Sequence, residues 1–567
     1  MSQAKNYWLR KSIGRRQLLH GVGVGTAGVA SLTLIGCGND DKSAAGSDGR
    51  GAPATTTPVP QTTAVIRKRG GTLTFGYHQD PAFLSPRLSR SGFDNAFLLV
   101  HGDNYIYVKS DGTTDPALSL FSSTETPDAS THVGKLRAGV KFHDGTPLNA
   151  QAVKAHLEYL LDQKKAAKFG YRSLIETIGS IEATDETTVR IKLSQPDAGF
   201  VSALAVAPGI PFSIAQVDKL GDAEILNPAM TGPYKVSSYR SGSDFSFDKN
   251  PEYWGPKDKE PYLDKIVFRA ITQDETRAAA LESGEIDAIW FAGSNDTTLR
   301  LSKNTNFQGR SFQVGPTLLT VNQNKAPLTD LRLRKAIAHA IDKRRILEAI
   351  FQGQGAVATS MLPSGTYGYL AYDPYPYDVK KAKELVAASG ATTPIKIQYA
   401  FGGTPPSASA QLEASLYKQM LDDVGFDVQL ENVAGSNAIF DALFTNKSHH
   451  IGAFSTGVRP DPVAQFALYS TSTSFYNAGG ATSDPAQKQL DELVSKARAT
   501  LDPKEREKLV FDAGKLQADN VFSQIPIVAR IRWVFAKPSI EGITDPEFVN
   551  TPAGASFRAR FLSLKNA

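Results

Sequence analysis

The sequence predicts an α/β protein, and three consecutive patterns in its second half carry this prediction. Apolar residues alternate over 395–399, as in a half-buried strand. Over 412–424 they recur at helical spacing, and over 426–430 they alternate again. A strand, a helix and a second strand of these lengths predict two parallel strands joined by a crossover helix. Strands are expected to return over 524–535.

The first half of the chain is expected to begin its fold at Gly70 and to open with strands. Residues 73–77 alternate as in a strand. Residues 105–108, with the turn residues at 111–112, predict a hairpin. A further strand is expected over 136–142.

Polar residues and prolines predict where several elements begin and end. Residues 143–145, His-Asp-Gly, are expected to form a strand-to-helix turn, and Asn149 to cap the helix that follows. Pro251 is expected to stop strand pairing. Asp342 and Asp502 are expected to cap helices that begin one residue later. These residues have structural rather than catalytic roles in this interpretation.

The N-terminal region carries two sequence signals that concern export. Arg15 and Arg16, followed by two leucines and a glycine-rich apolar run, resemble a twin-arginine export signal. Leu-Ile-Gly before Cys37 resembles the bacterial lipobox, in which the cysteine is acylated and becomes the first mature residue. Residues 1–36 are therefore predicted to be a signal and 37–69 a flexible tether. The alternative is an uncleaved membrane anchor, for which five glycines in the apolar run are unfavourable.

Composition excludes several classes of protein. The 567 residues are enough for two or more lobes with cores of their own. Five of the 62 basic residues and none of the 57 acidic ones lie in residues 1–36, so the remainder is neutral. A neutral chain lacks the basic surface that nucleic acid requires. Cys37 is the only cysteine, which excludes disulfides and zinc–thiolate sites from the folded part.

Six segments, in this order, resemble the extracellular solute-binding proteins of ABC importers, in the class that binds peptides and nickel complexes. The first of them reads Leu-Arg-Ala-Gly-Val-Lys-Phe-His-Asp-Gly-Thr-Pro-Leu-Asn. The resemblance extends from residue 70 to about residue 540 and indicates the class, but no particular ligand. The six segments are 136–149, 231–235, 250–255, 277–287, 331–343 and 377–385.

This resemblance implies a periplasmic-binding-protein-like α/β fold. Such a fold has two lobes, mixed sheets, an extra subdomain on the first lobe and a ligand cleft between the lobes. The chain of the resembling family crosses twice between the lobes and ends in the first one. The implied boundaries are 70–315 for lobe I with an extra subdomain at about 112–228, 316–525 for lobe II, and 526–567 for the return to lobe I.

The implied function is binding. We expect a monomeric receptor, held by its lipid on the outer face of the cell membrane, that captures a small molecule or peptide. Hinge closure buries such a ligand, and the closed form is presented to the permease subunits of an ABC importer. No catalytic residue, metal or cofactor is expected. The alternatives are a secreted hydrolase with two carboxylates of divergent pKa, or a receptor for a non-peptide anion or a metal chelate.

One stretch, 450–462, is expected to face the ligand. In peptide-binding relatives the matching stretch is a cleft strand that pairs with the peptide and presents an aspartate to its free amino terminus. Val458 stands where that aspartate would be, so a buried ammonium would lack its counter-charge. Arg459 beside it suits carboxylates or phosphates, which predicts a ligand without a free amino group. A solvated Arg459 is the alternative.

Two further residues complete the predicted site. An alignment shifted by a few residues would let Asp461 serve as the amine partner, although a helix cap is its other role. His78 ends the first strand, where the family's chain reaches the cleft. A surface or capping role is the alternative for this histidine. The substrate-binding residues expected from the sequence are His78, Phe454, Thr456, Val458, Arg459 and Asp461.

Overall fold

The computed structural model describes most of the chain after the predicted tether. It covers residues 67–565 apart from 79, 82, 90–96, 111, 257–260, 294–295, 365, 403–407, 435–437, 458, 460, 481–483, 521–522, 546 and 551–555. The predicted export signal and lipobox, with Arg15, Arg16 and Cys37, lie outside the described residues, as does Val458. None of the helices in these ranges is long and apolar enough to cross a membrane.

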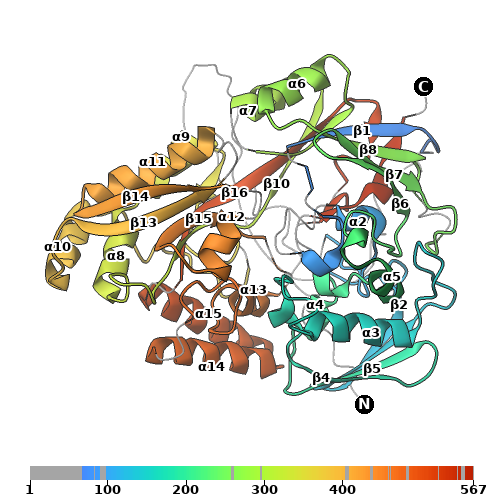
Figure 1. Cartoon of the computed structure of the whole chain (residues 1–567), viewed down its shortest axis with the longest axis horizontal. Coiled ribbons are helices and arrows are strands. Elements are labelled where there is room, and N and C mark those ends of the chain that lie inside the picture. The colour runs from blue at the N-terminus through green and yellow to red at the C-terminus, as the bar shows by residue number, and fades with distance from the viewer. Residues whose placement is uncertain are drawn as a thin grey trace, which may run out of the picture. The chain divides into compact units, whose positions relative to one another are not determined.

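The main sheet is built on both sides of one long strand, β16 (Figure 1). Its strands follow the order β14-β13-β15-β11-β16-β9-β1-β8-β7-β6, and β10 and β12 also pair with β16. The strands are β1 (Thr72–Tyr77), β6 (Tyr234–Arg240), β7 (Asp244–Lys249), β8 (Lys265–Ala270), β9 (Ala288–Ala292), β10 (Gln308–Gln313), β11 (Thr317–Val321), β12 (Gly355–Val357), β13 (Ile395–Gly402), β14 (Phe426–Val433), β15 (Ile451–Ser455) and β16 (Gln524–Ala536).

β16 links the two halves of this sheet. It pairs antiparallel with β11 between Gln524 and Val528, and with β10 between Ile531 and Ala536. In the sheet order, β9, β1, β8, β7 and β6 of the predicted lobe I lie on one side of β16, and β11, β15, β13 and β14 of the predicted lobe II lie on the other. β10 pairs with β16 on the edge opposite β9, and β12 pairs on the edge opposite β11. The predicted lobe boundaries stay predictions, because residues 67–567 belong to one compact unit.

The strand–helix–strand prediction for the second half is confirmed. β13 and β14 are parallel in register from Ile395 with Phe426, and α11 (Ala408–Asp422) packs against both. Gly425 ends the connection with φ +109°, a conformation that favours glycine. The carboxyl ends of β13, β14 and β15 therefore lie at one edge of the sheet, where parallel α/β sheets bind ligands.

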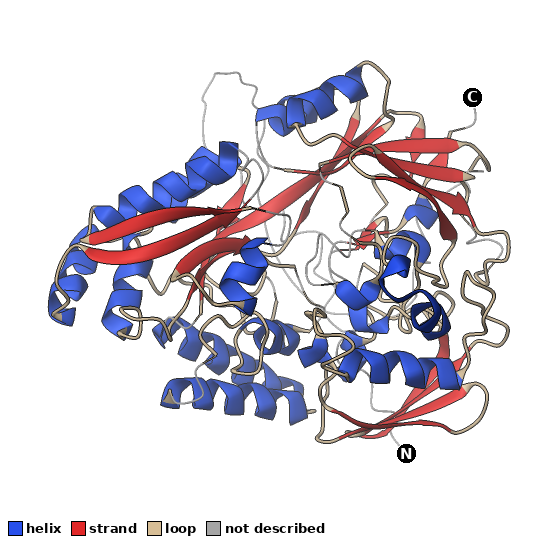
Figure 2. Ribbon diagram, in the orientation of Figure 1, coloured by secondary structure: helices blue, strands red, loops and turns tan. Residues whose placement is uncertain are grey.

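A second, four-stranded antiparallel sheet lies within the predicted extra subdomain. Its order is β2-β3-β5-β4, and α3 (Ala150–Leu161) packs on β4 and β5 (Figure 2). Asn149 caps α3 as predicted, with its side chain accepting from the Ala152 amide. The strands are β2 (Phe121–Asp128), β3 (Thr131–Leu136), β4 (Ile178–Ala183) and β5 (Thr188–Leu193).

One strand prediction in this region is wrong, and one hairpin prediction is confirmed only over a short stretch. The strand expected over 136–142 instead ends at Leu136, because Gly139 turns the chain with φ +76°. The apolar residues that suggested the strand, Val140 and Phe142, are buried without being in a strand. The expected hairpin at 105–108 is reduced to a single bridge between Val108 and Thr114.

The remaining helices surround the sheets, and their predicted caps are present. Asp342 caps α9 by accepting from the Arg345 amide, and Asp502 accepts from Glu505 at the start of α15. The other helices are α2 (Leu98–His101), α4 (Phe200–Ala203), α5 (Ile214–Leu220), α6 (Asp274–Glu282), α7 (Asp296–Ser302), α8 (Leu331–Ala340), α9 (Lys343–Phe351), α10 (Val379–Ser389), α12 (Ala438–Phe440), α13 (Pro462–Tyr469), α14 (Pro485–Ala499) and α15 (Pro503–Asn520).

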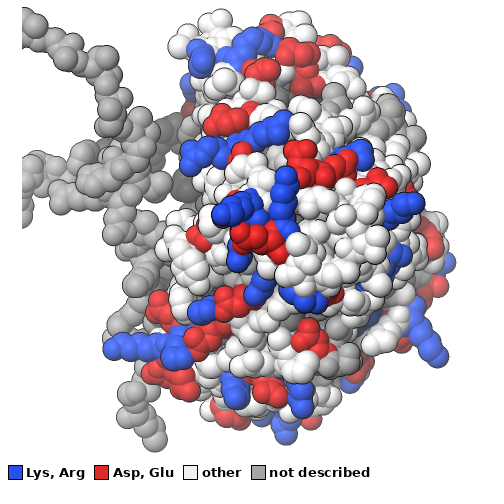
Figure 3. Space-filling model, turned by 90° about the vertical axis from the view of Figure 1, so that its left-hand side faces the viewer, with Lys and Arg blue, Asp and Glu red and all other residues white. Residues whose placement is uncertain are grey.

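Charged side chains of both signs are interspersed on the face that carries α9, α10 and α11, seen in Figure 3. This mixture matches the balanced charge of the chain beyond residue 36. It gives that face the character of an ordinary solvated surface rather than a basic track for nucleic acid.

Candidate functional site

The predicted ligand-facing stretch begins on β15, in the interior of the main sheet. β15 pairs antiparallel with β11 and parallel with β13, so its backbone is held on both sides. Phe454 is buried opposite Leu318. Thr456 follows the strand and donates from both its amide and its hydroxyl to the Pro316 carbonyl, each at 3.1 Å. The sheet therefore fixes the chain just before Arg459.

Phe454 belongs to an aromatic cluster, defined here as Phe440, Phe444, Phe454, Tyr469, Phe475 and Tyr476. The rings of Phe454 and Tyr476 are parallel within 3° at 6.1 Å. Phe444 meets Phe454 edge-on at 4.9 Å, and Tyr469 lies 5.1 Å from Tyr476. These rings are part of a hydrophobic core cluster, in which Phe454, Tyr469 and Tyr476 are buried.

Arg459 is buried, with only 6% of its surface exposed, so the solvated-loop interpretation is wrong. Its guanidinium lies over the ring of Tyr171 at 4.7 Å from the centroid. Tyr171 comes from the predicted extra subdomain, 288 positions earlier in the chain. Burial acts to lower the pKa of Arg459, but the phenol groups of Tyr171, Tyr469 and Tyr476 outweigh burial and raise the pKa. The side chain therefore stays charged.

Two donors of the Arg459 guanidinium have no acceptor in the part of the chain that the structure describes. No described residue accepts a hydrogen bond from its Nε or Nη1. No carboxylate of the described residues lies within ion-pair distance of the group either. A buried charge without such partners is costly and requires an explanation.

Asp461 has a structural role in α13. It caps the helix as predicted, with Oδ1 accepting from the Val463 amide at 2.9 Å. Its Oδ2 pairs with Nη2 of Arg506 at 2.8 Å, and both side chains are buried. Gly199 lies so close to this carboxylate that a Cβ at that position would overlap it. A role for Asp461 in binding a ligand ammonium stays a prediction, and its present partners already occupy both oxygens.

His78 lies directly after β1, in surroundings different from those of Arg459. Its ring meets that of Tyr77 edge-on at 4.4 Å. Burial, and then the positive charges of Arg277 and Arg532, hold the pKa of His78 well below its usual value. His78 is therefore neutral at physiological pH.

Sequence reasoning missed a charged group near the middle of β16. Arg530 and Arg532 alternate along the strand, and burial lowers the pKa of both. Glu413, on α11, is the acid that acts on Arg530. Burial raises the pKa of Glu413 to about 7, although the charge of Arg530 opposes the shift. Two arginines two positions apart in an otherwise apolar strand were the available signal.

Further contacts join the helices after the ligand-facing stretch to the predicted extra subdomain. Arg498, on α14, donates from Nη2 to the Ser173 carbonyl at 2.7 Å and pairs with Glu176 at 3.3 Å. The Ala198 amide donates to the Arg498 carbonyl at 2.7 Å. Together with Arg459 on Tyr171, these contacts form an interface between segments that the sequence assigned to different lobes.

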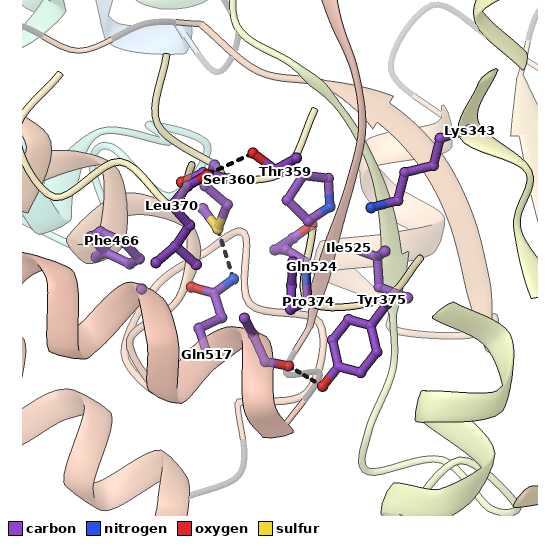
Figure 4. A pocket seen from close by; sticks show the side chains of 14 residues that line it. Lys343, Thr359, Ser360, Leu370, Pro374, Tyr375, Phe466, Gln517, Gln524 and Ile525 are labelled. Atoms are coloured by element: carbon purple, nitrogen blue, oxygen red, sulfur yellow. Dashed lines mark hydrogen bonds between the residues drawn. The ribbon is translucent and has the colours of Figure 1, made fainter. Parts of the chain in front are cut away.

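A pocket lies between α13, α15 and the start of β16 (Figure 4). Its polar groups are bound by the protein itself: Tyr375 donates to the Ala518 carbonyl, and Lys343 pairs with Asp373 at 2.8 Å. None of the residues predicted to bind the ligand is among its described lining residues. Its location and chemistry make it a weaker candidate for the ligand site than the surroundings of Arg459.

No group of three or more His, Cys, Asp or Glu side chains that could hold a metal occurs among the described residues. The adjacent histidines have separate partners: His449 binds Glu431 at 2.9 Å, and His450 binds the Ala326 carbonyl at 2.9 Å. The expectation of no metal stays a prediction.

Comparison with known proteins supplies the remaining evidence. Residues 115–477 match the model of the bacterial extracellular solute-binding proteins, family 5 Middle. The glutathione-binding protein GsiB of Escherichia coli (strain K12) is 30% identical over 400 residues, which cover 68% of this chain and 75% of GsiB.

Solved structures share the fold. The binding protein AgaA of A. tumefaciens R10, in complex with agropinic acid, superimposes with a TM-score of 0.78 at 24% identity, covering 88% of this chain and 99% of AgaA. The ABC transporter-associated periplasmic binding protein DppA of Helicobacter pylori, in complex with the peptide STSA, gives the same values. These neighbours are two-lobed periplasmic binding proteins, which confirms the predicted fold class.

Proposed function

The chain belongs to family 5 of the bacterial extracellular solute-binding proteins, and we propose that it is a lipid-anchored receptor for a peptide-like solute. Members of this family are extracytoplasmic receptors that deliver solutes to ABC importers. The proposal adds the anchor, the monomeric state and the kind of solute. The solute is bound between the two lobes and released to the permease subunits.

One observation carries the proposal beyond family membership. The stretch expected to face the ligand meets the predicted first lobe directly, with Arg459 on the ring of Tyr171. A solute bound at this position would contact both lobes and favour their closed arrangement. Shifting the population from 1:99 to 99:1 in favour of closure requires about 5.5 kcal/mol of preference for the closed form.

The proposal treats the protein as a receptor rather than a hydrolase. Asp197 and Asp461 form a buried pair of carboxylates, and burial raises the pKa of Asp197. Each is held by protein groups, however: Asp461 by Arg506, and Asp197 by the Gly199 amide at 2.9 Å. Neither is placed as an available acid or nucleophile in the way that hydrolysis by two carboxylates requires.

A thermal-shift screen of residues 38–567 tests capture. Glutathione, which GsiB is named for binding, is the first solute, followed by short peptides, sugars and metal chelates. At least one small solute is expected to raise the melting temperature in a saturable manner, because it binds the folded state alone. If none of these solutes does so, or if peptides or glycosides are turned over, the receptor proposal fails.

Replacing Cys37 with serine tests the anchor. The variant is expected to leave the membrane fraction and keep the melting temperature of the unaltered domain, because acyl chains supply the membrane affinity. Fractionation with membranes after a salt wash would contradict the proposed anchor.

A further inference from the structure

Arg459 is a buried cation, and two of its hydrogen-bond donors have no acceptor among the described residues. Its side chain is 6% exposed, and no described residue accepts from Nε or Nη1. The nearby carboxylate in the sequence, Asp461, is bound to Arg506 at 2.8 Å. Buried charged donors in native structures normally have acceptors, so the acceptor for Arg459 is expected to come from outside the described chain.

The surroundings of Arg459 leave two donors of the guanidinium, Nε and Nη1, without an acceptor among the described residues. Its Cζ lies over the ring of Tyr171 at 4.7 Å from the centroid, and a side-chain hydrogen bond with Tyr171 contributes to its raised pKa. In the planar group Nη1 lies on the side of Cδ, opposite the Nε–H, so these two donors point in different directions. Each can donate a charge-assisted hydrogen bond to a carboxylate oxygen, the kind of acceptor that arginine binds in proteins.

We infer that Arg459 binds a carboxylate of the transported solute, and that the receptor recognises the acidic rather than the amino end of a peptide-like ligand. This inference rests on the proposed function and adds the chemical class of solute. Tyr469 and Tyr476 of the aromatic cluster act on the charge of Arg459, so the apolar part of such a ligand would lie beside these rings.

The position of Tyr171 links carboxylate binding by Arg459 to the closure of the lobes. It belongs to the predicted first lobe, whereas Arg459 belongs to the second. The stacking partner that orients the guanidinium is therefore present only when the lobes meet. Carboxylate binding and lobe closure favour each other, since each stabilises the same arrangement of Arg459.

Four matched peptides and glutathione test the inference by titration calorimetry with residues 38–567. The peptides are trialanine, N-acetyl-trialanine and the C-terminal amide of each. The two free acids are expected to bind whether or not the amino group is acetylated. The two amides are expected to bind at least about a hundredfold more weakly, as is usual when a buried charge loses its partner.

Variants assign the effect to the residue. Arg459→Gln should reduce the affinity for the acids to that for the amides, and Arg459→Lys should retain part of it because the charge is kept without the planar set of donors. Arg137→Gln is the matched control, since Arg137 also lies over an aromatic ring, that of Trp254 at 5.3 Å. The control should bind all four peptides like the unaltered protein. The melting temperatures of the variants report whether they are folded.

The possible outcomes separate this inference from the proposed function. If the amides bind as tightly as the acids, or if Arg459→Gln leaves the affinity for the acids unchanged, the inference is wrong. If neutral or cationic solutes bind in the thermal-shift screen while no carboxylate probe binds, the inference fails and the receptor function stands. If no solute of any charge binds, both fail.

Discussion

Arg459 and Arg506 are two buried arginines near the start of α13, and they differ in what their guanidinium groups bind. Arg506 donates to the Ala497 carbonyl, to Tyr367 and to the Asp461 carboxylate. Arg459 has an aromatic ring on its face and no described acceptor for Nε or Nη1. Protein groups bind the guanidinium of Arg506, whereas we propose that a ligand carboxylate binds that of Arg459.

This difference separates a role in the fold from a role in binding. A protein is strongly destabilised when one partner of a fully hydrogen-bonded, buried ion pair is removed. A buried cation without a partner already imposes its desolvation cost on the folded state. Removing Arg506 should therefore reduce stability much more than removing Arg459 does. Removing Arg459 should mainly reduce ligand binding.

The largest effect is expected from Arg506→Met. This change leaves Asp461 buried without its cation, which typically costs about 3–5 kcal/mol. Urea unfolding of residues 38–567 at pH 7 measures the loss. Arg506→Met combined with Asp461→Asn should recover part of it, and no loss in the single variant would contradict the structural role of the pair.

An intermediate effect on the unfolding free energy is expected from the titration of Glu413. This carboxyl acts on Arg530, a third buried arginine. Burial raises the pKa of Glu413 in the folded protein to about 7, above the unfolded value of about 4.5. The folded state therefore binds more protons between these values, and its stability falls as pH rises from about 4.5 through 7. The fall is on the order of 3 kcal/mol, because one pKa unit is worth about 1.4 kcal/mol.

Glu413→Gln removes this titration and checks its sign. As pH rises from 5 to 8, the unfolding free energy of the variant should increase relative to that of the unaltered protein. A difference that is constant over this range would show that Glu413 does not titrate as described.

The smallest effect on stability is expected from Arg459→Met. No ion pair is lost, so the unfolding free energy should change by less than about 1 kcal/mol, and a small gain is consistent with the account. Urea unfolding alongside Arg506→Met gives the direct comparison. A loss as large as that of Arg506→Met would show that Arg459 has a structural partner.

Local elements of the fold were predictable because their causes are local. The crossover helix between β13 and β14 and the caps at Asn149 and Asp342 follow from apolar periodicity and from polar residues at helix starts. The strand expected over 136–142 failed because burial of Val140 and Phe142 does not require a strand. Apolar side chains in a turn can reach the same core.

The candidate site was less predictable because its contacts join distant parts of the chain. Arg459 was identified from its neighbours in sequence, but nothing near it indicates that Tyr171 covers its guanidinium. The pairing of Asp461 with Arg506 is likewise set by the packing of α13 against α15. The domain boundaries and the ligand contacts remain predictions.

A distance measurement between the lobes tests the central claim, that this protein is a receptor which closes on its solute. Cys37 is the only cysteine, so residues 38–567 can be spin-labelled solely at introduced cysteines. Lys192 on β5 and Lys488 on α14 are exposed positions in segments assigned to different lobes. Saturation with the solute that gives the largest thermal shift should shorten and narrow the distribution of distances between the two labels. A distribution that is unchanged at saturation would contradict the account.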